Sequence, residues 1–183
     1  MKISFLLSIL FLTGFLFLNC TDSENASEPI QAEREQEEPG SKTTIYLVRH
    51  GETDGPSSGN PDLSDTGRAR AERLTKEIGR RVDAVYSTDF PRTRQTAAPT
   101  AEAYGLTVRS YDVGDLRGVV DRILQQHRNG HVLLVGHSNT TPDVLNILTG
   151  SSGYSEIDHD DYGNLYVVRV GRSGKATVRE GRY

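Results

Sequence analysis

Thr43-Thr-Ile-Tyr-Leu-Val48 is a continuous run of apolar and β-branched residues, and Arg49-His50-Gly51 follows it directly. Such a run is typical of a strand that is buried on both faces of a parallel sheet. In sheets of this kind, ligands bind beyond the carboxyl ends of the strands. The run therefore predicts a buried strand, and it places Arg49 and His50 at a candidate site.

Strand and helix patterns alternate four times along the chain. This alternation favours an α/β fold, a three-layer sandwich with a mostly parallel central sheet and helices on both faces. Apolar periodicity, Gly and Pro predict strands at about 43–48, 83–87, 106–111, 132–135, 165–170 and 176–179, and helices at about 65–79, 91–104, 116–127 and 142–150.

The first twenty residues differ from the rest of the chain. Ile3 to Leu18 is an apolar stretch behind Lys2, and it is short of the roughly 20 apolar residues of a membrane-spanning helix. We interpret 1–20 as a signal peptide. Cys20, the only cysteine, follows this stretch as in a bacterial lipoprotein signal, although Asn19 replaces the usual small residue. The resemblance implies lipidation of Cys20 and an extracytoplasmic, membrane-anchored bacterial lipoprotein, periplasmic or on the cell surface; the alternative is an uncleaved anchor.

Residues 21–42 form a second distinct segment. They contain no aromatic residue, one large aliphatic residue, and seven acidic residues against two basic ones. A segment of this composition cannot bury enough apolar surface to fold, so we expect a disordered acidic tether. The remaining residues, 43–183, have the length of one domain. The net charge of −4 argues against a nucleic-acid partner, and a single cysteine excludes an internal disulfide.

Two histidines and two arginines are predicted to meet at one edge of the sheet. Arg49 and His50 follow the first strand, Arg92 lies after the second, and His137 follows the fourth. A neutral imidazole is a competent nucleophile toward phosphorus, and fixed cations around it would bind a dianionic phosphoryl group. A helix beginning near Thr141 would add free backbone N–H groups.

Four motifs in this order resemble the histidine phosphatase superfamily, the phosphoglycerate-mutase-like group. Leu47-Val-Arg-His-Gly-Glu-Thr53 is similar to the signature of that family. The similarity extends over essentially all of 43–183. The supporting motifs are Leu63-Ser-Asp-Thr-Gly-Arg-Ala-Arg-Ala71, Ser87-Thr-Asp-Phe-Pro-Arg-Thr-Arg-Gln-Thr-Ala97 and Val135-Gly-His-Ser-Asn139.

This resemblance implies a role for each of the four residues. His50 would be the nucleophile that forms a phosphohistidine, while Arg49, Arg92 and His137 would bind the phosphoryl oxygens. Water would then hydrolyse the intermediate, with no metal or cofactor. The expected activity is that of a phosphoric monoester hydrolase acting on phosphomonoesters or phosphohistidine, and the expected partner is a phosphorylated small molecule or a phosphoprotein.

The general acid does not follow from the motifs. One branch of the family places a carboxylate four residues before a glycine after the third strand, where this chain has Ser110 before Gly114. Another branch places Asp after the second histidine, where this chain has Ser138. Asp112 is therefore predicted as the general acid, with Asp115 as the next candidate. Without a well-placed general acid, the enzyme is expected to be a hydrolase restricted to leaving groups that need little protonation, rather than a sugar-phosphate mutase.

Three other interpretations remain open at this stage. Gly136-His-Ser138 imitates the nucleophile elbow of a serine hydrolase, with His159 beside possible acid partners. The domain could also be a non-catalytic phosphate-binding module. Glu52 could supply the missing acid, although pairing with a neighbouring arginine is the expected role. The natural substrate and the oligomeric state do not follow from the sequence.

Overall fold

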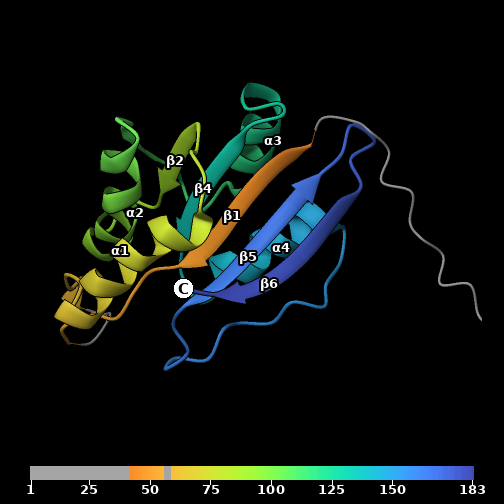
Figure 1. Cartoon of the computed structure of the whole chain (residues 1–183). Helices are drawn as coiled ribbons and strands as arrows, with labels where there is room; N and C mark the ends of the chain where they lie inside the picture. Colours follow the sequence, from red (N-terminus) through yellow and green to blue (C-terminus); the bar gives the residue numbers. More distant parts are fainter. Residues whose placement is uncertain (1–41, 56–58) are drawn as a thin grey trace, which may run out of the picture. The chain divides into compact units, whose positions relative to one another are not determined.

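The computed structural model describes residues 42–55 and 59–183. Within these ranges, six strands form one sheet in the order β3-β2-β4-β1-β5-β6 (Figure 1). The elements are β1 (Thr43–Arg49), α1 (Asp65–Ile78), β2 (Ala84–Ser87), α2 (Pro91–Ala103), β3 (Val108–Ser110), α3 (Leu116–Gln126), β4 (His131–Gly136), α4 (Thr140–Thr149), β5 (Asn164–Val170) and β6 (Ala176–Arg182).

The sheet is mostly parallel and is covered on both faces. β3, β2, β4 and β1 run parallel, whereas β5 and β6 are antiparallel to their neighbours. Alternate residues of the central strands enter two separate apolar cores, one shared with α1 and α2 and the other with α3 and α4. The predicted three-layer α/β sandwich is therefore confirmed.

Three predicted boundaries were wrong. β3 has only three residues, because it is an edge strand that pairs with β2 alone. β6 continues to Arg182, because it pairs with β5 along the whole length of that strand. α4 begins at Thr140 rather than at Pro142, and Asn139 is its N-terminal cap. The neighbouring strand thus limits β3 and extends β6, whereas a local side-chain cap sets the start of α4.

A close contact between Gly51 and Gly67 brings α1 against the loop after β1. Ser64 caps α1 by accepting a hydrogen bond from the N–H of Gly67 at 3.1 Å. A Cβ atom on Gly67 would collide with the carbonyl oxygen of Glu52. Only glycine therefore permits this approach, which holds the main chain just beyond His50 in place.

The predictions for the leader 1–20, the lipidation site Cys20 and residues 21–41 of the tether lie outside the described residues. Among the residues that are described, no helix has the length and apolar character needed to cross a membrane.

Candidate active site

The structure brings the two predicted histidines and two predicted arginines together at the carboxyl edge of the sheet. Arg49 ends β1 and lies opposite Gly136 at the end of the parallel strand β4. His50 and His137 follow these two positions, so their rings meet edge to face with centroids 5.4 Å apart. Arg92 reaches them from the first turn of α2.

One ring nitrogen of His50 is hydrogen-bonded to the main chain, and the other keeps its lone pair. Its Nδ1 lies 2.8 Å from the carbonyl oxygen of Gly51. A carbonyl oxygen only accepts hydrogen bonds, so Nδ1 carries the proton and Nε2 keeps its lone pair. The Nε–H of Arg92 donates to this Nε2 at 3.3 Å. Because His50 is only 3% exposed, this lone pair can react only with a group that enters the site.

Both imidazoles are neutral at physiological pH. The pKa of His50 is lowered to about 3, mainly by burial, which disfavours the charged form, and also by His137, Arg49 and Arg92, while the hydrogen bond to Gly51 partly opposes this shift. Burial and the two arginines likewise lower the pKa of His137 to about 4. A neutral His50 is the form that can attack phosphorus.

A chain of buried hydroxyl groups sets the tautomer of His137. The hydroxyl of Thr93 donates to the carbonyl oxygens of Thr88 and Phe90, both at 2.9 Å. It therefore accepts the proton of the Thr88 hydroxyl, which lies 2.9 Å away. Thr88 Oγ1 must then accept from His137 Nε2, also at 2.9 Å. The lone pair of His137 Nδ1 consequently faces Arg92, whose Nη2 lies 3.5 Å away.

Arg49 is positioned by the loop between α4 and β5. Its Nη1 donates to the carbonyl oxygens of Asp158 and Asp161 at 2.8 and 3.1 Å, and its guanidinium lies over the ring of Tyr162 at 4.1 Å. Within the described part of the chain, its buried Nε has no hydrogen-bond partner. This N–H group can donate to an oxygen atom of a bound anion.

Among the described residues, neither of the two guanidinium groups forms an ion pair with a carboxylate. Arg92 donates to the amide oxygen of Asn60 at 3.3 Å and lies over the ring of Phe90 at 4.7 Å. Burial and the neighbouring Arg49 lower its pKa. The described hydrogen bonds of both arginines go to carbonyl oxygens, an amide oxygen and imidazole nitrogens, none to a carboxylate. The site is therefore electrostatically suited to a dianion such as a phosphoryl group.

The carboxylates considered from the sequence are engaged elsewhere. Asp112 lies in an exposed loop and accepts from the N–H of Gly114 at 2.8 Å, and Asp115 caps α3. Glu52 forms a paired interaction with Arg70, with Oε2 lying 2.8 Å from Nε. This confirms the expected pairing of Glu52 with an arginine. No hydrogen bond recorded for the described residues joins these three carboxylates to the four residues of the site.

The elements of a serine hydrolase do not come together. The hydroxyl of Ser138 donates to Glu156 Oε1 at 2.9 Å, whereas His159 pairs with Asp160 on the surface. The expected N–H donors of the following helix are also engaged. The N–H of Thr141 donates to the carbonyl oxygen of His137 as a normal helical bond. For Thr141 that expectation was wrong, because α4 begins closer to His137 than the sequence predicts.

Thr88, Asn60, Tyr162 and Glu156 adjoin the site and were missed from the sequence. Thr88 follows β2, so its place at the sheet edge is a signal that could have identified it. The other three lie in loops without a motif. Because β5 is antiparallel to β1, the loop before β5 returns to the carboxyl end of β1 and brings Tyr162 and Glu156 with it.

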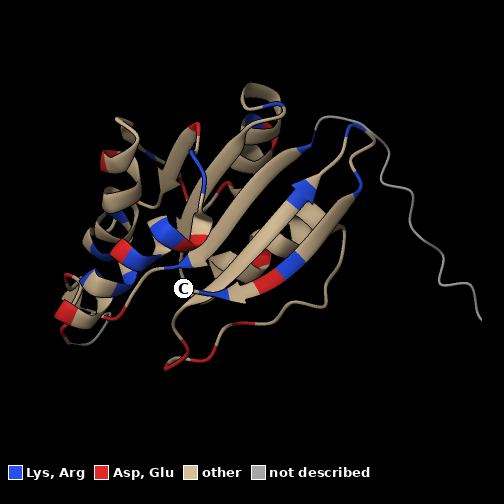
Figure 2. Cartoon of the chain, in the orientation of Figure 1, with Lys and Arg blue, Asp and Glu red and all other residues tan. Residues whose placement is uncertain are grey.

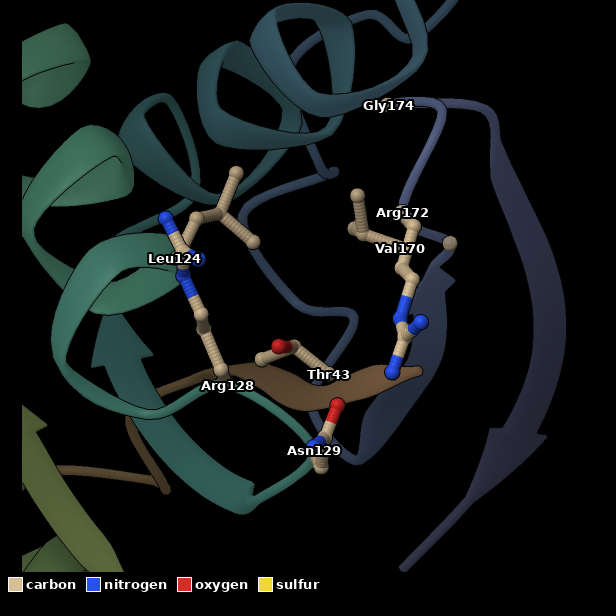
Figure 3. A pocket seen from close by; sticks show the side chains of 8 residues that line it. Thr43, Leu124, Arg128, Asn129, Val170, Arg172 and Gly174 are labelled. Atoms are coloured by element: carbon tan, nitrogen blue, oxygen red, sulfur yellow. The ribbon is translucent and has the colours of Figure 1, made fainter. Parts of the chain in front are cut away.

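The cavity in Figure 3, with a volume of about 560 Å³, lies at the opposite end of β1. It is lined by Thr43, Leu124, Arg128, Asn129, Val170, Gly171, Arg172 and Gly174, and it shares no residue with the histidine site. Over the described ranges, there is no group of three or more His, Cys, Asp or Glu side chains placed to hold a metal ion.

Part of this chain is similar in sequence to known phosphatases. The family model of the histidine phosphatase superfamily (branch 1) matches residues 45–112. Phosphoserine phosphatase 1 of Hydrogenobacter thermophilus is 37% identical over 75 residues, which cover 37% of this chain and only 36% of that relative. Over that part of the chain, the sequence is therefore similar to the histidine phosphatase superfamily and to a phosphoserine phosphatase.

Solved structures share the fold at low sequence identity. The protein histidine phosphatase SixA complexed with tungstate has a TM-score of 0.61 at 17% identity, covering 76% of this chain and 96% of that one. A mycobacterial glucosyl-3-phosphoglycerate phosphatase has a TM-score of 0.63 at 14% identity, and the match covers 79% of this chain and 98% of that one. Phosphoserine phosphatase from Entamoeba histolytica, in complex with 3-phosphoglyceric acid, has a TM-score of 0.62 at 15% identity. The match covers 77% of this chain and 97% of that one.

Proposed function

We propose that this chain, whose family-model match and fold support the histidine phosphatase superfamily, is a metal-independent phosphatase that acts through a phosphohistidine formed on His50. One observation carries the proposal. His50 is buried and neutral, its Nδ1 is fixed by Gly51, its Nε2 accepts a hydrogen bond from Arg92, and its ring meets that of His137.

Hydrolysis then takes two steps. His50 Nε2 attacks phosphorus as the bond from phosphorus to the leaving oxygen breaks, and Arg49 and Arg92 stabilise the charge on the other phosphoryl oxygens. The Nδ1 proton of His50 stays hydrogen-bonded to the carbonyl oxygen of Gly51, which helps to disperse the positive charge of the phosphorylated ring. Water next attacks phosphorus, the N–P bond breaks, and His50 returns to its neutral form.

The proposed substrates are phosphomonoesters or a phosphorylated histidine. The names of similar proteins support both classes, since one relative is a phosphoserine phosphatase and one structural neighbour is a protein histidine phosphatase. Phosphoserine and phosphohistidine are therefore the first two compounds to screen.

We also propose, from residues 1–42 alone, that lipid on Cys20 holds the chain at a bacterial membrane outside the cytoplasm. Labelling with a radioactive fatty acid tests this proposal in cells. Label and membrane association should both be lost in Cys20→Ala, and label that persists in this variant would contradict the proposal.

The decisive assay compares the full chain with His50→Ala. Hydrolysis of p-nitrophenyl phosphate is followed between pH 5 and 8 with EDTA present, and a rapid acid or alkaline quench is analysed by mass spectrometry. Wild type should turn over and carry a base-stable, acid-labile phosphate on His50. His131→Ala is the matched control, because His131 starts β4 at the far end of the sheet.

His50→Ala should lose at least about a thousandfold in kcat/KM, while His131→Ala should stay within about threefold of wild type. Turnover that survives in His50→Ala, or that disappears with EDTA, would contradict the proposed function. Phosphate binding without any turnover on the screened compounds would favour the non-catalytic binding module instead.

A further inference from the structure

The proposed reaction needs a proton that the four site residues do not supply. The leaving oxygen departs with negative charge unless an acid protonates it. Both arginines remain protonated, and the Nδ1 proton of His50 is committed to Gly51. His137 directs its Nε2 proton to Thr88 and presents an unprotonated Nδ1. The acid must therefore come from another side chain near the site.

Several nearby carboxylates are excluded by their partners. Glu52 accepts hydrogen bonds from Arg70, which lowers its pKa and holds it ionised. Asp161 is bound by Asn164 and Arg182, and these hydrogen bonds also lower its pKa. A carboxylate paired with a guanidinium group is a poor proton donor, because this positive charge favours the ionised form.

Glu156 has a different position. Its Oε1 accepts the hydrogen bond from Ser138 Oγ at 2.9 Å, and Ser138 is the residue after His137. The N–H of Ile157 donates to the carbonyl oxygen of Ser138, also at 2.9 Å. A side-chain bond and a main-chain bond thus fix Glu156 beside the second histidine.

The same loop also positions the phosphoryl-binding groups. The loop between α4 and β5 carries Glu156, and its carbonyl oxygens at Asp158 and Asp161 hold Arg49. Figure 2 shows several acidic residues along this loop. Of its four carboxylates (Glu156, Asp158, Asp160 and Asp161), Glu156 is the one whose described hydrogen bond reaches the residue next to His137.

We propose that Glu156, held by Ser138, is the general acid that protonates the leaving oxygen; this inference rests on the proposed function. As His50 Nε2 bonds to phosphorus, the bond to the leaving oxygen breaks and that oxygen takes the proton of the Glu156 carboxyl group. In the second step, the resulting carboxylate accepts a proton from the attacking water. The carboxyl group is then restored, and no proton is gained or lost by the enzyme.

The exposure of Glu156 agrees with this role. His50 is buried at the base of the site, so in-line attack directs the leaving group away from His50 toward solvent. Glu156 is exposed, and it contacts Ser138, the residue after His137.

The test compares a good and a poor leaving group in the full chain. Glu156→Gln should lower kcat/KM for phenyl phosphate by about 30-fold or more, but that for p-nitrophenyl phosphate by less than about threefold, since nitrophenolate needs little protonation. The double variant Glu156→Gln/Ser138→Asp should recover at least about a third of the lost phenyl phosphate activity, because it returns a carboxylate beside His137.

Two variants control for charge and for the earlier candidate. Asp160→Asn removes one acidic charge from the same loop, where Asp160 contacts only His159 among the described hydrogen bonds. Asp112→Asn removes the acid predicted from the sequence. Both should leave the ratio of the two kcat/KM values within about twofold of wild type.

Each other result overturns the assignment. An equal loss on both substrates in Glu156→Gln would indicate a structural role, and no loss would exclude an acid role. A selective loss in Asp112→Asn, or a wild type that hydrolyses p-nitrophenyl phosphate alone, would also refute it. The proposed function fails separately, through activity that survives in His50→Ala on either substrate.

Discussion

The hydroxyl of Tyr183 donates a 2.6 Å hydrogen bond to the main-chain carbonyl oxygen of Arg49. Tyr183 is buried, and its ring belongs to the core shared with α1 and α2. The end of β6 is thus tied to the residue that precedes the proposed nucleophile. An interaction between residues 134 positions apart in the chain stabilises the main chain of the site.

Tyr183→Phe should lower the free energy of unfolding by about 1–3 kcal/mol, because it leaves the carbonyl oxygen of Arg49 buried without this partner. Urea denaturation at pH 7 measures the loss. Tyr104→Phe is the matched control, since the Tyr104 hydroxyl makes an exposed bond to the carbonyl oxygen of Arg80. A control loss as large as that of Tyr183→Phe would show that the buried bond has no special value.

Thr88→Val should reduce kcat/KM for p-nitrophenyl phosphate by about tenfold. The valine cannot accept the Nε2 proton of His137, so the tautomer whose Nδ1 lone pair faces Arg92 is no longer selected. Thr88→Ser should restore at least half of the activity. Thr75→Val removes a comparable hydroxyl pair with Thr100, which involves none of the four site residues, and should change little. Equal activity in Thr88→Val and wild type would refute this role.

Glu52→Gln should destabilise the fold without changing the dependence on the leaving group. The Glu52–Arg70 pair is largely buried, so removing its charge costs about 1–3 kcal/mol. The hydrogen bond from Arg70 lowers the folded-state pKa of Glu52 below its unfolded value. The stabilisation is therefore present above the unfolded pKa and is lost as the pH falls through the folded pKa.

Denaturation at pH 7 and at pH 3 measures this effect, and the difference between wild type and Glu52→Gln should shrink at the lower pH. Asp65→Asn breaks an exposed pair with Arg68 and should cost under about 0.5 kcal/mol. If Glu52→Gln selectively slowed phenyl phosphate hydrolysis, Glu52 rather than Glu156 would be the acid.

Stability should fall as the pH drops from 7 toward 4. His50 and His137 have folded pKa values of about 3 and about 4, below the unfolded value of 6.5. The unfolded chain therefore binds more protons in this range, and the stability present above pH 6.5 is lost progressively as the pH approaches the folded values. The slope has an upper limit of about 1.4 kcal/mol per pH unit for each histidine.

Urea midpoints at four pH values measure this slope. In the double variant His50→Gln/His137→Gln the slope should be clearly smaller, although His127 and His131, whose pKa values are also lowered by burial, keep part of it. An unchanged slope would mean that the two site histidines are not held neutral by the fold.

Inorganic phosphate should raise the melting temperature of wild type, since a ligand that binds only the folded state stabilises it. Arg92→Lys should lose most of this rise, because lysine cannot reproduce the planar guanidinium that contacts both histidines. Arg94→Lys, on the same helix but exposed and paired with Asp89, should keep it. Differential scanning fluorimetry measures the melting temperatures. An equal rise in wild type and in both variants would show that phosphate binds elsewhere.

The apolar run of β1 and the regular alternation of patterns were sufficient to predict the α/β sandwich. They were also sufficient to predict the meeting of His50, Arg49, Arg92 and His137. All four lie at or just beyond the carboxyl ends of parallel strands, and these ends share one edge of the sheet. Such a convergence follows from local periodicity and strand direction, which the sequence by itself contains.

The surroundings of these residues depend on tertiary structure. The tautomer of His137 depends on hydroxyl contacts with Thr88 and Thr93, and Glu156 reaches the site because the antiparallel β5 returns its loop to the end of β1. Glu52 and Asp112, equally plausible as acids in the sequence, are engaged by Arg70 and by a turn. Local sequence does not encode these choices, because they arise from packing between segments that are distant in the chain.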